Sequence, residues 1–314
     1  MSLNTQKTTI DWLRIRVQAD PREALEALRP MFGTLGNDLS LKGLDRGILG
    51  FQQAAQISIA DMPVGRMDYG GESQRGWLRI DVPATGCEWV QDWQAAQSVE
   101  SLEKAQIRRL DIALTTWDGQ IGHDLVVQSH QDGRFITGGR PPAMQTITSS
   151  DPRAGRTCYV GKRDKSDKFF RAYEKGFEML NKLLPRNPIL KDVHAIEGKP
   201  IEGIYRCELE LKAQNCDIPW DVIERRDQYF AGSYPFCADV LPGVEADILM
   251  RRPERAVQAS LAAALENCLI QYGPTLYTAM HAYGGDISAV WDKVCARHHS
   301  QALLEAGVLL VEHE

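Results

Sequence analysis

The chain has 314 residues, of which 43% are hydrophobic and 25% are charged, and its formal net charge is −6. This is the composition of a globular protein with one large domain or two ordinary ones. The negative net charge excludes a protein that coats nucleic acid through bulk charge, so any DNA contact must come from a local group of basic residues. One such group lies between Arg153 and Lys175, where eight Lys or Arg residues stand against three acidic ones.

Cysteine usage and hydropathy predict a reduced, cytoplasmic protein. The seven cysteines are an odd number, none belongs to a CxxC pair, and no secretory apolar segment is found near the N-terminus. The most apolar segment, 256–270, is interrupted by polar residues. It therefore falls short of the roughly 18 to 20 apolar residues that cross a bilayer, and we expect no membrane partner.

Alternation of apolar and polar side chains predicts strands in the first half of the chain, and spacing of three to four residues predicts helices. The first helix begins at Asp20, where Asp-Pro supplies a cap and a first helical residue, and Gly33 is its expected end. In chain order, we expect a strand at 13–17, a helix at 20–33, strands at 51–59 and 77–82, a helix through 89–93 and a strand at 107–115.

The second half repeats this plan after a long connection. Residues 118–151 are rich in Gly, Pro, Ser and Thr, which marks a loop. We then expect strands at 157–160, 168–175 and 204–212 and a helix at 177–184. The repeated order of strands and helices predicts an internal duplication.

Beyond about residue 220 the apolar spacing becomes helical. One helix, containing 257–269, is expected to end at Gly273-Pro274, and another to open at Asp286 as its cap. The residues expected to point inward from that last helix are Ile287, Val290, Trp291 and Val294.

These elements predict an α+β fold. Two related strand-helix units, about 8–118 and 152–220, form an antiparallel-type sheet with one open catalytic face, and together they make a domain at 1–220. Residues 221–314 form a C-terminal helical subdomain.

Three of the predicted strands place polar side chains on one face, since residues i and i+2 of a strand point the same way. Asp111 stands opposite the apolar face of its strand, and Glu208 and Glu210 stand about 7 Å apart on theirs. Tyr173 lies between two cations. The residues placed on the shared face are Asp111, Glu208, Glu210, Arg171, Tyr173 and Lys175.

These residue types suit chemistry on a phosphodiester. Carboxylates bind hard divalent cations such as Mg²⁺ or Mn²⁺, which stabilise the charge that develops in an in-line displacement. A tyrosine hydroxyl is a poor nucleophile until nearby positive charge or a metal favours the phenolate, and Arg171 and Lys175 are placed to help. Pattern alone also fits, and by itself favours, ordinary solvated strand faces with cross-strand ion pairs.

The stretch from Gly155 to Lys175, GRTCYVGKRDKSDKFFRAYEK, resembles the Y-x-G-(S/K)-x-x-S-x-x-x-x-R-x-Y-x-K stretch of the replication initiation factor family of rolling-circle plasmids and filamentous phages. The strand around Asp111 precedes this stretch and the strand around Glu208 and Glu210 comes after it, which is the order expected for the family. The resemblance covers roughly residues 8–220. This chain departs from the family in two places. One extra residue precedes Ser166, and Thr115 stands where many relatives carry a second acid.

The resemblance implies that Tyr173 is the nicking nucleophile, that Arg171 and Lys175 hold the phosphate, and that Asp111, Glu208 and Glu210 hold a divalent metal, Mg²⁺ or Mn²⁺. The protein would then cut one strand of origin DNA, keep the 5′ end as a phosphotyrosine and release a 3′-OH for a polymerase. The expected DNA contacts, besides these residues, are Arg156, Lys162, Arg163, Lys165, Lys168 and Arg206.

Expected partners are origin DNA, single-stranded at the nick, and a host helicase and polymerase. The helical segment after Trp220 has two open roles, recognition of duplex DNA and homodimer formation. Two rival functions also remain open. The first is a non-catalytic binder of an origin or operator, and the second, disfavoured, is a tyrosine recombinase that leaves a 3′ phosphotyrosine.

Overall fold

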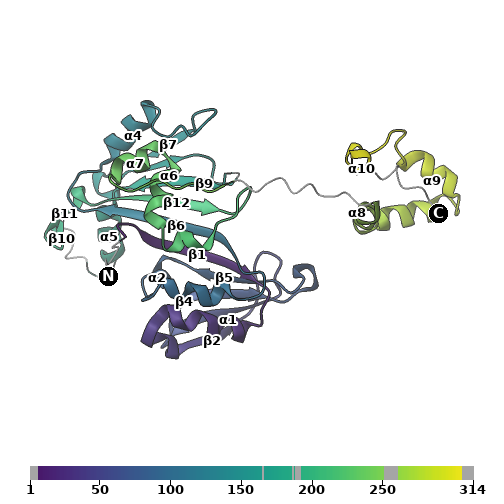
Figure 1. Ribbon diagram of the computed structural model, residues 1–314, viewed down its shortest axis with the longest axis horizontal. Coiled ribbons are helices and arrows are strands. Elements are labelled where there is room, and N and C mark those ends of the chain that lie inside the picture. Colours follow the sequence, from purple (N-terminus) through teal and green to yellow (C-terminus); the bar gives the residue numbers. More distant parts are fainter. Residues whose placement is uncertain (1–5, 165, 186, 188–191, 251–260, 306–314) are drawn as a thin grey trace. The chain divides into compact units, whose positions relative to one another are not determined.

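In the computed structural model, the chain folds into two compact units, Met1–Arg252 and Pro253–Glu314 (Figure 1). The structure describes residues 6–164, 166–185, 187, 192–250 and 261–305. The first unit extends past the expected boundary at 220, because the helices that follow the last strand pack against the sheet. Within the described residues, no helix is both long and apolar enough to span a bilayer.

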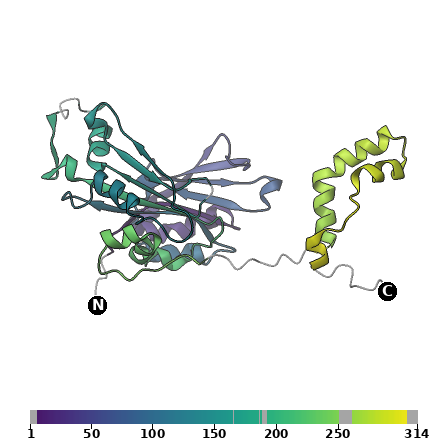
Figure 2. The same cartoon turned by 90° about the horizontal axis from the view of Figure 1, so that it is seen from above.

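The first unit is built on one ten-stranded antiparallel sheet with the order β2-β3-β4-β5-β1-β6-β12-β9-β8-β7 (Figures 1 and 2). A separate two-stranded ribbon pairs β10 (Ala195–Ile196) with β11 (Lys199–Pro200). The strands of the large sheet are β1 (Thr9–Val17), β2 (Leu39–Leu44), β3 (Gln53–Ile59), β4 (Met62–Tyr69), β5 (Leu78–Val82), β6 (Gln106–Thr116), β7 (Met144–Ile147), β8 (Thr157–Val160), β9 (Lys168–Tyr173) and β12 (Tyr205–Lys212).

Helices bury the apolar face of this sheet. The first, α1, is capped by the Asp20 side chain, which accepts a hydrogen bond from the Arg22 N–H, as expected. The described helices of this unit are α1 (Pro21–Leu28), α2 (Ala84–Cys87), α3 (Gln97–Glu100), α4 (His123–Gln131), α5 (Lys175–Leu183), α6 (Arg226–Ser233) and α7 (Pro235–Val240), besides short 3₁₀ turns.

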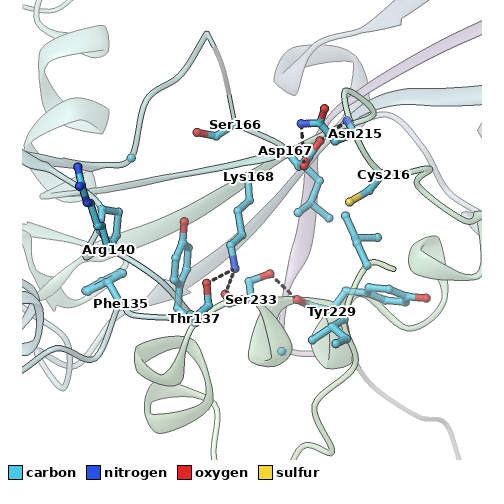
Figure 3. A pocket seen from close by; sticks show the side chains of 18 residues that line it. Phe135, Thr137, Arg140, Ser166, Asp167, Lys168, Asn215, Cys216, Tyr229 and Ser233 are labelled. Carbon is cyan, nitrogen blue, oxygen red and sulfur yellow. Dashed lines mark hydrogen bonds between the residues drawn. The ribbon is translucent and has the colours of Figure 1, made fainter. Parts of the chain in front are cut away.

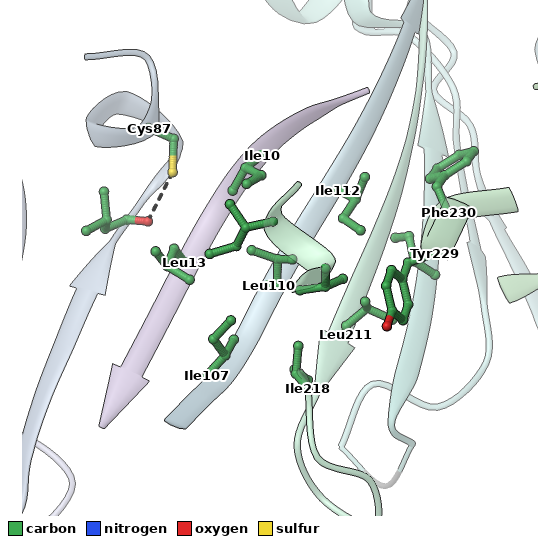
Figure 4. Packing of buried hydrophobic residues seen from close by; sticks show 14 of the residues in the cluster. Ile10, Leu13, Cys87, Ile107, Leu110, Ile112, Leu211, Ile218, Tyr229 and Phe230 are labelled. Atoms are coloured by element: carbon green, nitrogen blue, oxygen red, sulfur yellow. Dashed lines mark hydrogen bonds between the residues drawn. The ribbon is translucent and has the colours of Figure 1, made fainter. Parts of the chain in front are cut away.

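The central strands supply the core. Leu13 of β1, Leu110 of β6 and Leu211 of β12 are buried on one side of the sheet, where Tyr229 and Phe230 of α6 pack (Figure 4). The intervening residues of these strands therefore point to the other face. The two-residue alternation predicted for β1, β6 and β12 is confirmed.

The strand order divides the sheet into two halves that repeat each other. Outward from the central β1–β6 pair, the order is β1-β5-β4-β3-β2 on one side and β6-β12-β9-β8-β7 on the other. Each half opens with a long central strand and then a helix, α1 in the first half and α4 in the second. The topology thus contains the predicted duplication, with a pseudo-two-fold axis at the β1–β6 pair.

Several expected elements differ from those observed in the first unit. Strand β9 ends at Tyr173, and Lys175 begins α5, because the chain turns at Glu174. The segment expected to be only a loop contains α4 and β7. No helix forms through 89–93. The short α2 ends at Cys87, and turns follow it.

The second unit contains α8 (Leu261–Ala282), α9 (Ile287–Val294) and α10 (Gln301–Glu305). Helix α8 continues through Pro274 instead of ending there, because an internal proline removes one backbone donor without stopping the turns on either side. The expected residues 257–260 of this helix lie outside the described residues. Asp286 caps α9 as predicted, with its side chain accepting from the Ala289 N–H.

The inward stripe expected on α9 is only partly buried. Val290 is buried, but Ile287 is 69% exposed and Trp291 63% exposed, and Val294 is exposed as well. Among the described residues of this unit, α8 and α10 leave these three side chains in contact with solvent.

Close packing at α2 gives a test of the first unit. A Cβ on Gly86 would lie 1.8 Å from the backbone oxygen of Val64, which belongs to β4 and cannot rotate away. We expect Gly86→Ala to lower the free energy of unfolding by about 2 kcal/mol or more, through overpacking against rigid backbone. The measurement is the urea midpoint of the full chain.

The matched control is Gly43→Ala in the edge strand β2. A Cβ there meets nothing within 4 Å, so its urea midpoint should stay at or slightly above that of the unchanged protein. Equal midpoints for both variants would contradict the packing of α2 on β4.

Candidate active site on the polar face of the sheet

Adjacent strands bring the six predicted site residues together. Strand β12 lies between β6 and β9, with Glu210 opposite Asp111 and Glu208 opposite Arg171. Tyr173 stands opposite Arg206. The three acids and the tyrosine share one face, as the alternation predicts. This face is not open to solvent at the acids, however, because cationic side chains cover them.

Tyr173 is held by a hydrogen bond to Glu208. Its hydroxyl donates to Glu208 Oε1 at 2.7 Å, and the Lys175 Nζ donates to the tyrosine hydroxyl oxygen at 3.4 Å. The side chain is only 8% exposed. Burial, and then the negative charge of Glu208, raise the pKa of the tyrosine well above its usual value of about 10. Tyr173 is therefore a neutral phenol at rest, despite the two cations beside its ring.

Arginines neutralise the three carboxylates. Arg171 forms a close ion pair with Glu208, and Arg163 binds Glu210 with Nε at 3.0 Å. Arg109 bridges Asp111 and Glu210, with its NH2 group 2.5 Å and 3.1 Å from their oxygens. Burial raises the pKa of Asp111 to about 6, and the facing carboxylates of Glu210 and Glu208 oppose its ionisation, while Arg109 works against that rise.

The pKa of Glu210 is shifted in the opposite direction from that of Asp111. Burial alone would raise its pKa, but the hydrogen bond from Arg163 and the charges of Arg109, Arg163 and Lys212 outweigh burial and lower it. Glu210 therefore keeps its negative charge at neutral pH.

The residues as arranged do not form a metal site. Among the described residues, no three His, Cys, Asp or Glu side chains lie close enough together to hold an ion. The cavity bounded by Asp111, Glu208 and Glu210 measures only about 10 Å³, and arginines occupy the carboxylate oxygens that a cation would need. The Arg163 and Arg171 side chains are 54% and 39% exposed, so both have room to leave.

Two larger cavities lie near Tyr173. One, of about 370 Å³, is lined by Tyr173, Arg171 and Arg156 from the β8–β9 side. The other, of about 560 Å³, is lined by Lys175, Arg206 and Trp117, among others, but not by Tyr173 itself. A DNA strand can thus reach the tyrosine through the first cavity, while neighbours of the tyrosine line the second.

The predicted DNA contacts fall in different places. Arg206 lies beside Tyr173 and donates to Asp11 and Thr115. Arg156 binds Glu174 and Asp124 at the mouth of the first cavity, and Lys162 is exposed in the β8–β9 turn. Lys165 lies outside the described residues.

Lys168 lies on the opposite face of the sheet. Its Nζ donates to the Ser233 carbonyl and to Thr137 Oγ1 inside a cavity of about 510 Å³ (Figure 3). Tyr234 also contacts this ammonium, and burial lowers the pKa of Lys168. It does not join the group around Tyr173.

Two site residues escaped the sequence prediction. Arg109, which bridges two acids, lies two positions before Asp111 on the same strand, so the period of two could have placed it. Asp11 fixes Arg206 with an oxygen 2.9 Å from its NH1. No local pattern connects Asp11 to Arg206, which is 195 residues away.

Comparison with known proteins relates this chain to a family and to a solved fold. Residues 105–251 match the model of the replication initiation factor family. The family resemblance is confirmed. The matched replication initiation factor region contains Asp111, Tyr173, Glu208 and Glu210, whereas β1 to β5 precede it. No curated protein matches the chain.

A solved structure shares the fold. The rolling circle replication initiator protein from Geobacillus stearothermophilus superposes with a TM-score of 0.51 at 19% identity, covering 80% of this chain and 88% of that one. At this identity the likeness shows the α+β fold with its large antiparallel sheet, and no more.

Asp111 makes the stability of this site depend on pH. Its pKa is raised on folding to about 6 from an unfolded value near 3.9. Between about pH 3.9 and pH 6 the folded state therefore holds a proton on Asp111 that the unfolded state has lost. Stability is therefore lost as pH rises through that window, by about 2 to 3 kcal/mol. We expect the free energy of unfolding of Asp111→Asn, measured by urea titration, not to show this fall between pH 4 and pH 7.

The control is Asp45→Asn, at an exposed position outside the site. It should follow the pH dependence of the unchanged protein. If Asp111→Asn follows it too, the carboxyl of Asp111 does not titrate in this window.

Proposed function

We propose that this protein initiates rolling-circle replication by nicking one strand of origin DNA with Tyr173. The observation that carries the proposal is the position of the tyrosine hydroxyl, 2.7 Å from a carboxylate and 3.4 Å from an ammonium, beside cavities lined by arginine. The match of residues 105–251 to replication initiation factors supports the reaction class, and the likeness of the fold to a rolling circle replication initiator protein supports the rolling-circle mode.

Glu208 is the proton acceptor in this proposal. A general base must lie within hydrogen-bond reach of the proton that it takes, and Glu208 Oε1 meets this condition. The Tyr173 oxygen forms the new bond to phosphorus as its proton passes to Glu208. The bond from phosphorus to the 3′ oxygen breaks, and that oxygen takes a proton from solvent. The products are a 5′-phosphotyrosine and a free 3′-OH, and reversal of the same steps rejoins the strand.

The surrounding cations stabilise the charge that gathers on the phosphate. Arg171 at rest is bound to Glu208, so neutralising Glu208 with the tyrosine proton frees Arg171 to bind phosphate oxygens. Lys175 contacts the hydroxyl, and Arg206 stands opposite Tyr173 on the neighbouring strand β12. Origin DNA, single-stranded at the nick, is the proposed substrate, and a host helicase and polymerase the proposed users of the 3′-OH.

The divalent metal remains a prediction. Carboxylate chemistry favours Mg²⁺ or Mn²⁺ near Asp111, Glu208 and Glu210, but binding requires Arg163 and Arg171 to release their partners first. No step above passes through the ion.

Replacing the nucleophile tests the proposal directly. We expect Tyr173→Phe to lose nicking of supercoiled origin plasmid by roughly a thousandfold or more, since no hydroxyl remains to attack. The covalent protein-DNA adduct should vanish from denaturing gels. The matched control is Tyr159→Phe, because Tyr159 lines the same cavity from the neighbouring strand β8. Nicking by Tyr173→Phe at the unchanged rate would rule out Tyr173 as the nucleophile, and absence of nicking by the unchanged protein would leave only a non-catalytic origin binder.

A chelator tests the metal separately. We expect EDTA to stop nicking and added Mg²⁺ or Mn²⁺ to restore it, while binding of the same DNA by the chelated protein is retained. Full nicking in EDTA would contradict the requirement for a divalent metal, but not the role of Tyr173 as nucleophile.

A further inference from the structure

A second basic pocket lies on the polar face of the sheet, away from Tyr173. It measures about 370 Å³ and is formed where β1, β5, β6 and β12 meet. No Asp or Glu is among its lining residues, and two aromatic side chains, Trp77 and Phe51, stand in its wall. Its cations are Arg14, Arg16, Arg79, Arg108, Arg109 and Lys212.

Like charges stand directly opposite one another in this pocket. Arg79 faces Arg16 across the β5–β1 pair, Arg14 faces Arg109 across β1–β6, and Arg109 faces Lys212 across β6–β12. Such pairs destabilise a sheet unless anions lie between them. Carboxylates beside the pocket pair with four of these cations, Asp81 with Arg14 and Arg79, and Glu210 with Arg109 and Lys212. Burial, and then the charge of Arg109, lower the pKa of Arg14, and the charges of Asp111, Glu210 and Asp68 work against that fall.

The duplication relates this part of the sheet to the strands that carry Tyr173. In the β4–β5 pair, Arg66 stands opposite Asp81 and Asp68 opposite Arg79. In the β9–β12 pair, Arg171 stands opposite Glu208 and Tyr173 opposite Arg206. The two arrangements correspond residue by residue, so Asp68 occupies the position equivalent to the tyrosine. The first half therefore keeps the cations of the site without a nucleophile.

The same correspondence superposes the two pockets. In the first half, Arg14 stands opposite Asp81 and Arg16 opposite Arg79 across the β1–β5 pair. In the second half, Ala113 stands opposite Glu208 and Thr115 opposite Arg206 across the β6–β12 pair. The residues Ala113, Thr115 and Arg206 line the cavity of about 560 Å³ beside Lys175, and their counterparts Arg14, Arg16 and Arg79 line the second pocket. The two cavities are thus pseudo-two-fold copies at opposite ends of one polar face.

We propose that this second pocket binds the single-stranded DNA that continues from the nick, holding a backbone phosphate on its arginines and a base against Trp77. This inference rests on the proposed function. Lys212 lies six positions after Arg206 on β12, a path of about 20 Å, so the phosphate held here lies several nucleotides from the one that is cut. Aromatic side chains within a basic groove are typical of single-strand binding, because any base can stack on them.

Salt dependence of binding tests the pocket without cleavage. In the Tyr173→Phe background, we measure the affinity for a fluorescent thymidine 20-mer at several salt concentrations. We expect Arg16→Gln/Arg108→Gln to lower the slope of log K against log salt by about 0.7 to 1.4, at about 0.7 per lost phosphate contact. Trp77→Ala should weaken binding roughly tenfold and leave the slope unchanged.

The matched control removes two exposed cations outside the pocket. Arg22→Gln/Lys42→Gln makes the same charge change at positions on α1 and β2, and should leave both slope and affinity as they were. An unchanged slope in Arg16→Gln/Arg108→Gln, or an equal fall of the slope in the control, contradicts DNA binding by this pocket. A loss seen only with a 20-base-pair duplex overturns its assignment to single strands.

Plasmid nicking separates the two proposals. If the Tyr173-containing protein nicks but the slope does not change, the pocket fails and the nickase stands. If the slope changes as expected but the Tyr173-containing protein never nicks, the nickase fails and the pocket remains a DNA-binding site.

Discussion

Carboxylates buried on a sheet face must be paired with cations, and this constraint organises the polar side of the protein. Asp68, Asp81, Asp111, Glu208 and Glu210 are all buried, and an unpaired charge at such a depth would cost several kcal/mol. Each has an arginine on a neighbouring strand or two residues along its own strand. The arginines reach their partners only in the observed register, so the pairing of charges and the pairing of strands specify each other.

The same constraint is satisfied twice, once in each half of the sheet. Arg66 and Asp81 repeat Arg171 and Glu208, and the two copies meet at the β1–β6 pair. The copies differ at one decisive position, where Asp68 accepts ion pairs from arginines and Tyr173 donates to a glutamate. Under the two proposals, exchange of this side chain separates a half that only binds DNA from a half that also cuts it.

Much of this architecture was predictable, since alternation in β1, β6 and β12 identifies the buried face whatever strands lie beside them. The shared face of Asp111, Glu208, Glu210 and Tyr173 followed from that rule. What the rule cannot supply is a partner across the sequence. Arg206 meets Asp11 only because β12 and β1 both flank β6. The end of β9 and the exposed stripe of α9 also escaped prediction, because tertiary packing decides both.

The protonation state of Tyr173 at rest follows from the same pairing of buried charges. A tyrosine whose hydroxyl donates to a buried carboxylate, itself held by Arg171, keeps its proton until something changes the balance around Glu208. In the proposed reaction a DNA phosphate is such a change, because it offers Arg171 a second anion as Glu208 takes the tyrosine proton. The proposal thus couples binding of the phosphate to activation of the tyrosine, which stays a neutral phenol wherever no phosphate is bound.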